Sequence, residues 1–158
     1  MGRVAMPAIL LGVLVAAASA RAASATPATG VVSIMLARGT IGPFRSQARG
    51  FTIDARTTAD VVVARVTLAV GGNTGWHTHA GPVFAVVKAG HLAVTRAQGA
   101  RGCTTRVYGP GQAFIEAPDM VHIGRNAGAT PVVLIATYTN VPVGGAPATS
   151  AAAPAACR

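Results

Sequence analysis

A stretch of alternating side chains between Val61 and Val70 constrains the fold of this 158-residue chain more than any other. The stretch is rich in β-branched residues, which favour extended backbone. Successive side chains of a strand point to opposite faces. We therefore expect a long strand with one buried face, formed by Val62, Ala64, Val66, Leu68 and Val70.

Short segments of the same character recur along the chain, separated by turns rich in glycine and proline. We expect further strands at 31–36, 49–55, 77–79, 83–88, 91–96, 103–108, 112–116, 121–125 and 131–139. Gly71–Gly75 and Gly109–Gly111 should form turns, because glycine and asparagine adopt positive φ at little cost. Helical periodicity is absent throughout. The pattern predicts an all-β fold, an antiparallel sandwich or barrel in a single domain over residues 23–140.

The first 22 residues have the layout of a secretory signal peptide. Arg3 supplies a positive start, Ala8–Ala18 is apolar, and Ala20 or Ala22 offers a cleavage site. The apolar run is shorter than the about 20 residues of a membrane-spanning helix. We expect a secreted or cell-envelope protein with no transmembrane span after cleavage; an uncleaved N-terminal anchor is the alternative. At the other end, residues 141–158 should form an irregular tail rich in alanine and proline.

Two cysteines, Cys103 and Cys157, are present. An oxidising compartment favours a disulfide between such a pair. The bridge would close a loop of about 55 residues and contribute roughly 4 kcal/mol in the chain-entropy model. Two unpaired thiols are the alternative.

The chain carries 13 lysines and arginines against 4 acidic residues, for a formal charge of +9. The arginines are scattered singly, and few aromatic side chains could stack on bases. We therefore expect no specific nucleic-acid partner. Weak adhesion to acidic polymers of the envelope is compatible with the charge.

Three of the four histidines are candidates for metal ligands. His77 and His79 are two residues apart, so on a strand their side chains point the same way. His122 lies further along the chain, after the turn that contains Pro118. Imidazole nitrogens are common ligands of divalent metals. We expect the three rings to converge on one ion inside the barrel.

The spacing of these residues resembles the two motifs of the cupin superfamily. Residues 71–90 resemble the first motif, with glycines, a turn, His-x-His and a hairpin glycine. Residues 111–126 resemble the second, with Gly111, His122 and Asn126 in its expected places. The chain is also similar to a group of small exported bacterial cupin proteins, through Ala37–Thr40, Thr74–His79 and the two cysteines. The resemblance implies a jelly-roll barrel, also called a double-stranded β-helix or RmlC-like fold.

This chain departs from the first cupin motif at the position of its glutamate ligand, which falls on Val83 or Phe84. It also has Ala117-Pro118-Asp119 where the second motif carries Pro-x-Gly. Glu116 is a candidate fourth ligand or general base, although a strand end often carries such a residue on the outside. Three imidazoles suit Fe, Zn, Ni, Cu or Mn, and the sequence does not distinguish among these divalent ions.

Other residues have simpler expected roles. His91 should lie on the surface, Asp119 should form the turn before His122, and Asn126 should fix the following turn through backbone hydrogen bonds. Trp76 should face away from the histidines. Barrel filling is expected from Phe84, Val86, Phe114 and Ile115.

Three functions remain open. The first is a metal-dependent enzyme, in the form of a dioxygenase-like cupin that acts on a small molecule. The second is a non-catalytic cupin that binds a small ligand. The third is an envelope protein with a vestigial site. Nothing in the sequence excludes a homodimer, and the fold alone does not choose among these functions.

Overall fold

The computed structural model describes residues 25–157, so the predicted signal peptide over residues 1–22 lies outside the described part. Strands and two short 3-10 turns make up its regular structure. In chain order they are β1 Thr29–Ile41, β2 Phe44–Ala48, β3 Phe51–Ala55, β4 Ala59–Asn73, β5 His77–Thr78, β6 Val83–Ala89, β7 Leu92–Ala97, η1 Gly99–Arg101, β8 Cys103–Tyr108, β9 Ala113–Glu116, β10 His122–Asn126, β11 Val132–Val141, β12 Thr149–Ser150 and η2 Ala155–Cys157. In this part of the chain, no helix is long and apolar enough to cross a bilayer.

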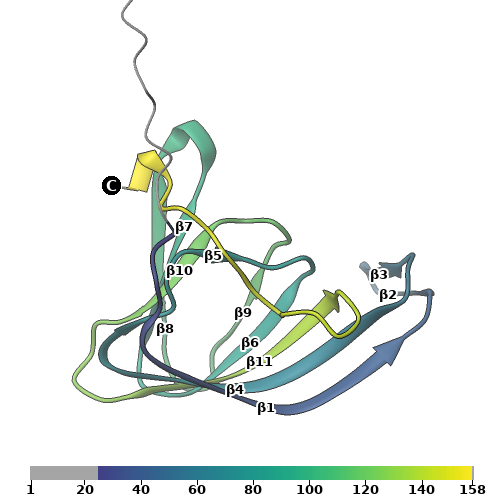
Figure 1. The fold of residues 1–158 in the computed structure, drawn as a ribbon, viewed down its shortest axis with the longest axis horizontal. Coiled ribbons are helices and arrows are strands. Elements are labelled where there is room, and N and C mark those ends of the chain that lie inside the picture. The colour runs from purple at the N-terminus through teal and green to yellow at the C-terminus, as the bar shows by residue number, and fades with distance from the viewer. Residues whose placement is uncertain (1–24, 158) are drawn as a thin grey trace, which may run out of the picture.

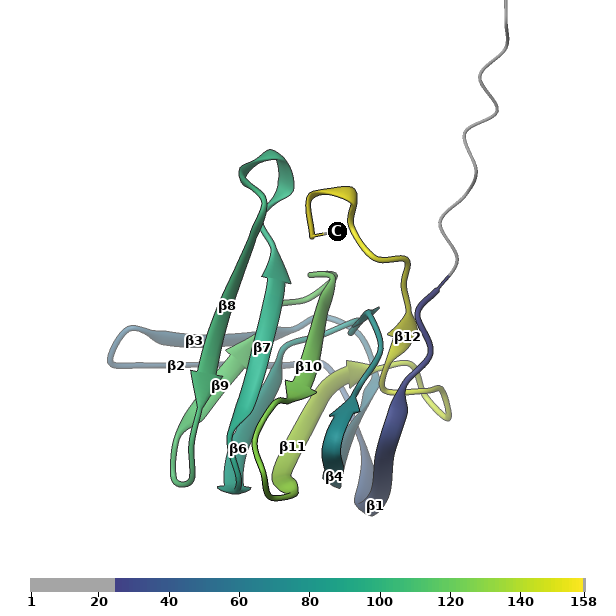
Figure 2. The same ribbon diagram turned by 90° about the vertical axis from the view of Figure 1, so that its left-hand side faces the viewer.

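Ten strands form one antiparallel sheet that curls into a nearly closed barrel (Figure 1). Its main path runs β12-β5-β10-β4-β11-β6-β9, and β1 adds to β4 while β7 and β8 extend from β10. Figure 2 shows β8, β7 and β10 side by side, and likewise β11, β4 and β1. The prediction of an all-β antiparallel barrel is confirmed.

The long strand predicted at Val61–Val70 is β4, and its alternation holds over most of its length. Val62 and Leu68 are 2% and 0% exposed, and Ala64 and Val66 between them are also buried. Val70 is 57% exposed, so its predicted burial is wrong. The ladder between β4 and β11 ends at Leu68, which pairs with Val132. Beyond that pair, β4 continues to Asn73 without β11 beside it.

The register between β6 and β9 decides which predicted barrel fillers face inward. Ala85 pairs with Phe114, and both are buried in the core. Phe84 pairs with Ile115 one position away, which places this pair on the opposite face. Ile115 is 51% exposed and Val86 is 45% exposed, so the predicted filling role is wrong for both, and it holds for Phe114.

A hairpin formed by β2 and β3 projects from the barrel (Figure 1). We expected one extended segment at 49–55 and no strand at β2, because Phe44–Ala48 mixes polar and apolar residues without a clear alternation. The turn falls at Arg49 and Gly50, which have φ values of 47° and 80°. Two consecutive positive φ values are typical of a tight hairpin turn.

The C-terminal segment is more ordered than the irregular tail that its composition predicts. It contributes β12, which pairs with β5, and η2 at its end. A disulfide joins Cys103 at the start of β8 to Cys157, with 5.4 Å between their Cα atoms. The predicted pairing is therefore present in the structure. Figure 2 shows this segment crossing one end of the barrel.

Candidate metal centre

The strand ladder brings three histidines together at one end of the barrel. His77 in β5 is the direct partner of His122 in β10. His79 follows β5 by one residue. Its ring centre lies 4.8 Å from that of His77 and 5.1 Å from that of His122. Each ring offers one nitrogen, and the three nitrogens lie within 4.8 Å of one another. The convergence expected from the sequence is thus present in the geometry.

All three imidazole rings are oriented by backbone carbonyls. Nδ1 of His77 lies 2.9 Å from the Gly75 carbonyl oxygen, and Nδ1 of His122 lies 2.8 Å from that of Met120. Nδ1 of His79 lies 2.8 Å from the carbonyl oxygen of Pro147. A carbonyl oxygen can only accept a hydrogen bond, so each Nδ1 must carry the proton. In a neutral ring this arrangement leaves Nε2 as a lone-pair donor, which is the form that binds metal.

The Nε2 atoms of His79 and His122 are buried and make no directed hydrogen bond within residues 25–157. Their side chains are 3% and 1% exposed. An unpartnered polar atom in a protein interior costs free energy unless a ligand satisfies it. Together with the oriented rings, these two atoms fit a bound divalent ion, for which nitrogen ligands of this kind are suitable.

Glu116, at the end of β9, points into the same site. Its Oε2 is 3.2 Å from Nε2 of His79, and its Oε1 is 3.1 Å from Nε2 of His122. These distances permit hydrogen bonds, but the bond directions do not favour them, so we interpret the contacts as close electrostatic approaches. The side chain is nearly buried rather than on the outside of the barrel.

The shifts in pKa follow from burial and from the carboxylate. Burial, and after it the nearby His122, lowers the pKa of His77 to about 4. Burial also opposes protonation of His122, but the contact with Glu116 outweighs it and raises the pKa of His122 above its usual value. For Glu116, burial alone would raise the pKa, yet the two histidines hold that pKa well below its ordinary value. Glu116 is therefore an anion in this structure.

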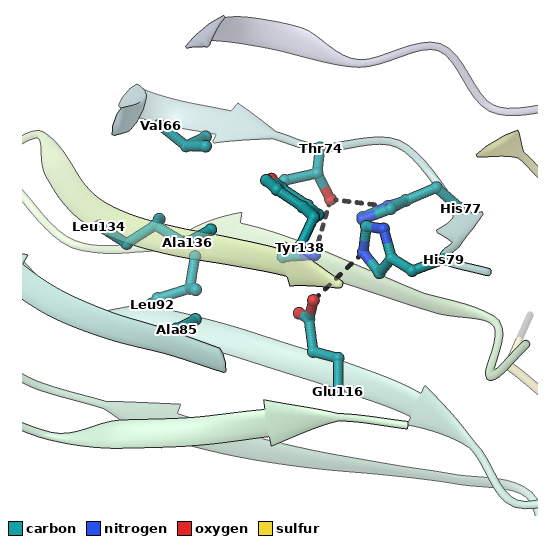
Figure 3. Close-up of a pocket in the computed structure, with 11 residues that line it drawn as sticks. Val66, Thr74, His77, His79, Ala85, Leu92, Glu116, Leu134, Ala136 and Tyr138 are labelled. Carbon is teal, nitrogen blue, oxygen red and sulfur yellow. Dashed lines mark hydrogen bonds and ion pairs between the residues drawn. The ribbon is translucent and has the colours of Figure 1, made fainter. Parts of the chain in front are cut away.

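A cavity of about 40 Å³ lies beside the cluster (Figure 3). Its polar wall consists of Thr74, His77, His79, Glu116 and Tyr138, and its apolar wall is Val66, Ala85, Leu92, Leu134 and Ala136. Gly124 also lines it. The volume is enough for one or a few water-sized molecules. The site is therefore a narrow, mostly apolar space with its polar groups at one end.

Sequence reasoning missed Thr74 and Tyr138 as parts of this wall. Thr74 Oγ1 lies 3.4 Å from Nδ1 of His77 and accepts a hydrogen bond from the Gly124 backbone N–H. The Tyr138 ring centre is 5.2 Å from that of His79. Burial, and after it the charge of Glu116, raises the pKa of Tyr138 to about 12. The alternation of β11, with Leu134 and Ala136 facing inward, is the signal that could have found Tyr138.

The other residues singled out in the sequence lie outside the cluster. His91 is exposed, as expected. Asp119 has a φ of 57°, in keeping with a turn. Trp76 is buried without lining the cavity, and the guanidinium of Arg125 lies 5.7 Å from its ring centre. Asn126 binds backbone groups on both sides of the following turn, as expected.

The family model described as "Cupin domain" matches residues 64–138, which include all three histidines and Glu116. Residues 64–138 are a cupin domain. The expected resemblance to the cupin superfamily is confirmed. The matched region spans β4 to β11, so the cupin domain comprises most of the barrel wall and the whole histidine cluster.

Solved structures with a similar fold include several cupins. A Bacillus subtilis oxalate decarboxylase, described with Mn(II) centres, is 20% identical with a TM-score of 0.51, over 57% of this chain and 23% of that one. A cupin-like protein from Thermotoga maritima is 22% identical with a TM-score of 0.49, over 59% and 65% of the two chains. An oxalate oxidase is 26% identical with a TM-score of 0.45, over 49% of this chain.

This chain covers only about 40% of that oxalate oxidase. The search of curated proteins gave no match. At 20% identity and a TM-score of 0.51, the likeness to the oxalate decarboxylase supports the fold alone. The function has to be argued from the site itself.

Proposed function

We propose that this protein is an exported metal-binding cupin that holds one divalent ion with His77, His79, His122 and Glu116 and acts on a very small molecule. The orientation of the three imidazole rings carries the proposal. Each Nδ1 is bound to a backbone carbonyl, and the Nε2 atoms of His79 and His122 are buried without a hydrogen bond. A site that had lost its ion would have no need to retain three such orientations.

Glu116 compensates for the glutamate that the first cupin motif lacks in this chain. It is the direct cross-strand partner of Val83, one of the two positions on which the missing ligand falls. Directly opposed residues of an antiparallel pair point to the same face. A carboxylate on β9 therefore reaches the space that a carboxylate on β6 would occupy. Its negative charge also offsets part of the charge of a divalent cation.

A bound divalent ion would supply a Lewis acid, and a redox centre if the metal is Fe, Mn or Cu. The residues of the chain have three tasks around it. Glu116 and the histidines hold the ion, the apolar wall excludes water, and Tyr138 offers a phenol that stays protonated at neutral pH. With few acid–base groups in the cavity, an oxygenase fits better than hydrolysis.

A non-catalytic cupin that binds a small ligand is the second candidate. The volume of about 40 Å³ favours it, because a larger substrate would need the barrel to open. A vestigial envelope protein is the least supported candidate. Without a metal ion, the buried Nε2 atoms of His79 and His122 would carry the free-energy cost of unpaired polar groups with no compensation.

Metal binding by purified protein without a histidine tag tests the core of the proposal. We expect about one Mn²⁺ or Co²⁺ per chain by titration and elemental analysis. His77→Ala and His79→Ala should abolish binding, since each removes a ligand. His91→Ala is the matched control, because His91 is exposed and outside the cluster. Equal metal content in all four proteins would refute the site.

Glu116→Gln separates the two roles of Glu116. A ligand role predicts weaker metal binding, by about tenfold or more, because the amide is neutral. A general-base role predicts unchanged metal affinity and loss of turnover. Titration with Mn²⁺ at fixed pH distinguishes these outcomes without an assay for the reaction.

Oxygen consumption distinguishes an enzyme from a binder. The Fe²⁺-loaded protein should consume oxygen with one of a panel of small thiols and phenols, and His79→Ala should not. Binding of a panel member without oxygen uptake would favour the non-catalytic function.

We also propose export to the envelope or the medium. The disulfide between Cys103 and Cys157 supports it, because such bonds persist in oxidising compartments. N-terminal sequencing of protein from cell fractions should give a mature chain that begins after Ala20 or Ala22. Full-length protein confined to the cytoplasm would contradict export.

We propose that the protein forms a homodimer through the exposed apolar residues of β1 and of the β2–β3 hairpin. Val32, Met35 and Leu36 on β1 and Phe44 and Phe51 on the hairpin are more than half exposed. An isolated hairpin is marginally stable in water, and apolar strands with a free edge tend to pair with another chain. Light scattering should give twice the monomer mass; a monomer at all concentrations would contradict the proposal.

A further inference from the structure

We infer that the C-terminal strap, defined as residues 142–157, is a positioning element that sets the tautomer and orientation of His79. Its importance for metal affinity rests on the metal site proposed above. The strap lies beyond the matched cupin domain, which ends at residue 138.

His79 differs from the other two histidines in how its ring is held. His77 and His122 bind carbonyls only two residues away, so their own segments orient them. Nδ1 of His79 instead binds the carbonyl oxygen of Pro147, which is 68 residues away in sequence. The orientation of His79 therefore depends on the placement of the strap.

The strap lies against the segment that carries the His-x-His pair. Thr149 pairs with Thr78 and Ser150 pairs with His77, so β12 is an added strand beside β5. The backbone N–H of Ala151 also donates to the Trp76 carbonyl oxygen at 2.8 Å. Since β5 has only two residues, β12 and β10 on its two sides are its whole ladder.

The strap is anchored on both sides of Pro147. Before it, Arg38 Nη2 donates to the Gly145 carbonyl oxygen at 2.7 Å, and the Gly144 N–H donates to Asp60 Oδ2 at 2.9 Å. After it, Cys157 is joined to Cys103 of β8. Two distant anchors hold a proline- and alanine-rich segment that has little apolar side chain to bury. The two anchors together therefore hold the Pro147 carbonyl oxygen next to Nδ1 of His79.

The first test reads the tautomer of His79 by ¹⁵N NMR of the metal-free protein. In the wild type, all three clustered histidines should show the Nδ1–H form. In Cys103→Ser/Cys157→Ser, His79 should lose that form while His77 and His122 keep it. Retention by all three would overturn the inference, and this result does not depend on whether the protein binds metal.

The second test measures Co²⁺ affinity and the Co²⁺ absorption spectrum. Loss of a group that orients a metal-bound histidine weakens metal binding by about 10-fold to 100-fold. We expect that range for the double serine variant. A wild type that binds Co²⁺ and a variant with the same affinity and spectrum would overturn the inference and leave the proposed function intact. A wild type that binds no metal would instead refute the proposed function.

Two further variants separate positioning from general loss of stability. Ala151→Pro keeps the disulfide but removes the N–H that binds Trp76, and it should reproduce the change at His79. Val87→Ala creates a cavity at a fully buried core position and lowers stability without touching the strap. It should leave the His79 tautomer unchanged. A change at His79 in Val87→Ala equal to that in the strap variants would show that stability alone is responsible.

Discussion

Asn126 shows how much one polar side chain contributes to the wall beside the histidine cluster. Its Nδ2 lies 2.9–3.2 Å from the carbonyl oxygens of Leu68, Ala69 and Thr130. Its Oδ1 accepts the N–H of Gly128. Two amide hydrogens shared among three carbonyls use both donors of the asparagine, and the bond from Gly128 uses one of its two acceptor lone pairs. The side chain thus joins β10, β4 and the turn before β11.

Replacement of Asn126 by alanine should destabilise the protein by about 2–3 kcal/mol, because buried carbonyls lose their donor. Asn126→Asp should cost more, since it places a carboxylate against three carbonyl oxygens. Urea unfolding at neutral pH measures both changes. An aspartate variant as stable as the wild type would show that these bonds do not hold β10 in place.

At the scale of elements, the short strand β5 determines where two of the three histidines lie. It is preceded by Gly75, which has a φ of 67° and whose carbonyl oxygen binds His77. A Cβ at Gly75 would also meet the backbone of Thr26 and Ala28. The turn into β5 therefore requires glycine for both its conformation and its close contact with the N-terminal segment.

Gly75→Ala should be clearly more destabilising than Gly71→Ala. Both positions have positive φ, which costs about 1–2 kcal/mol for alanine. Gly71 has open space around its hydrogen, whereas Gly75 has backbone atoms in the way. Thermal unfolding compares the two variants. Equal losses of stability would mean that the N-terminal segment moves aside without cost.

Over the whole molecule, Asp60 connects the first strand, the barrel wall and the C-terminal strap. Its carboxylate accepts hydrogen bonds from Thr40 Oγ1 at 2.6 Å, from Arg38 Nε at 2.6 Å and from the Gly144 N–H. Arg38 and Thr40 belong to the Ala37–Thr40 stretch, which resembles that of small exported cupin proteins, and their contact with Asp60 gives that stretch a structural role. The bonds from Thr40, Gly144 and Arg38 lower the pKa of Asp60 from 3.8 to about 2.

This shift predicts how the stability contributed by Asp60 varies with pH. A carboxyl group whose pKa is lower in the folded state stabilises the protein above its unfolded pKa of 3.8. The contribution is lost as pH falls from about 4 through about 2, where the folded group takes up its proton. The difference in free energy of unfolding between wild type and Asp60→Asn should therefore shrink over this range.

Urea unfolding of the metal-free proteins between pH 2 and 5 measures this difference. Asp54→Asn is the control, because the ion pair of the Asp54 carboxylate is with Arg56, whose side chain is 84% exposed. It should change stability little at any of these pH values. A gap between wild type and Asp60→Asn that stays constant with pH would contradict the prediction.

The sequence alone determined the fold class, the inward face of β4 as far as Leu68 and the meeting of His77, His79 and His122. These features follow from alternation within a strand and from motif spacing, which are properties of neighbouring residues. The inward direction of Glu116, the outward direction of Val86 and Ile115, and the contact between Pro147 and His79 were decided only by the tertiary structure. Each depends on the register between strands distant in sequence, and packing of the whole barrel sets that register.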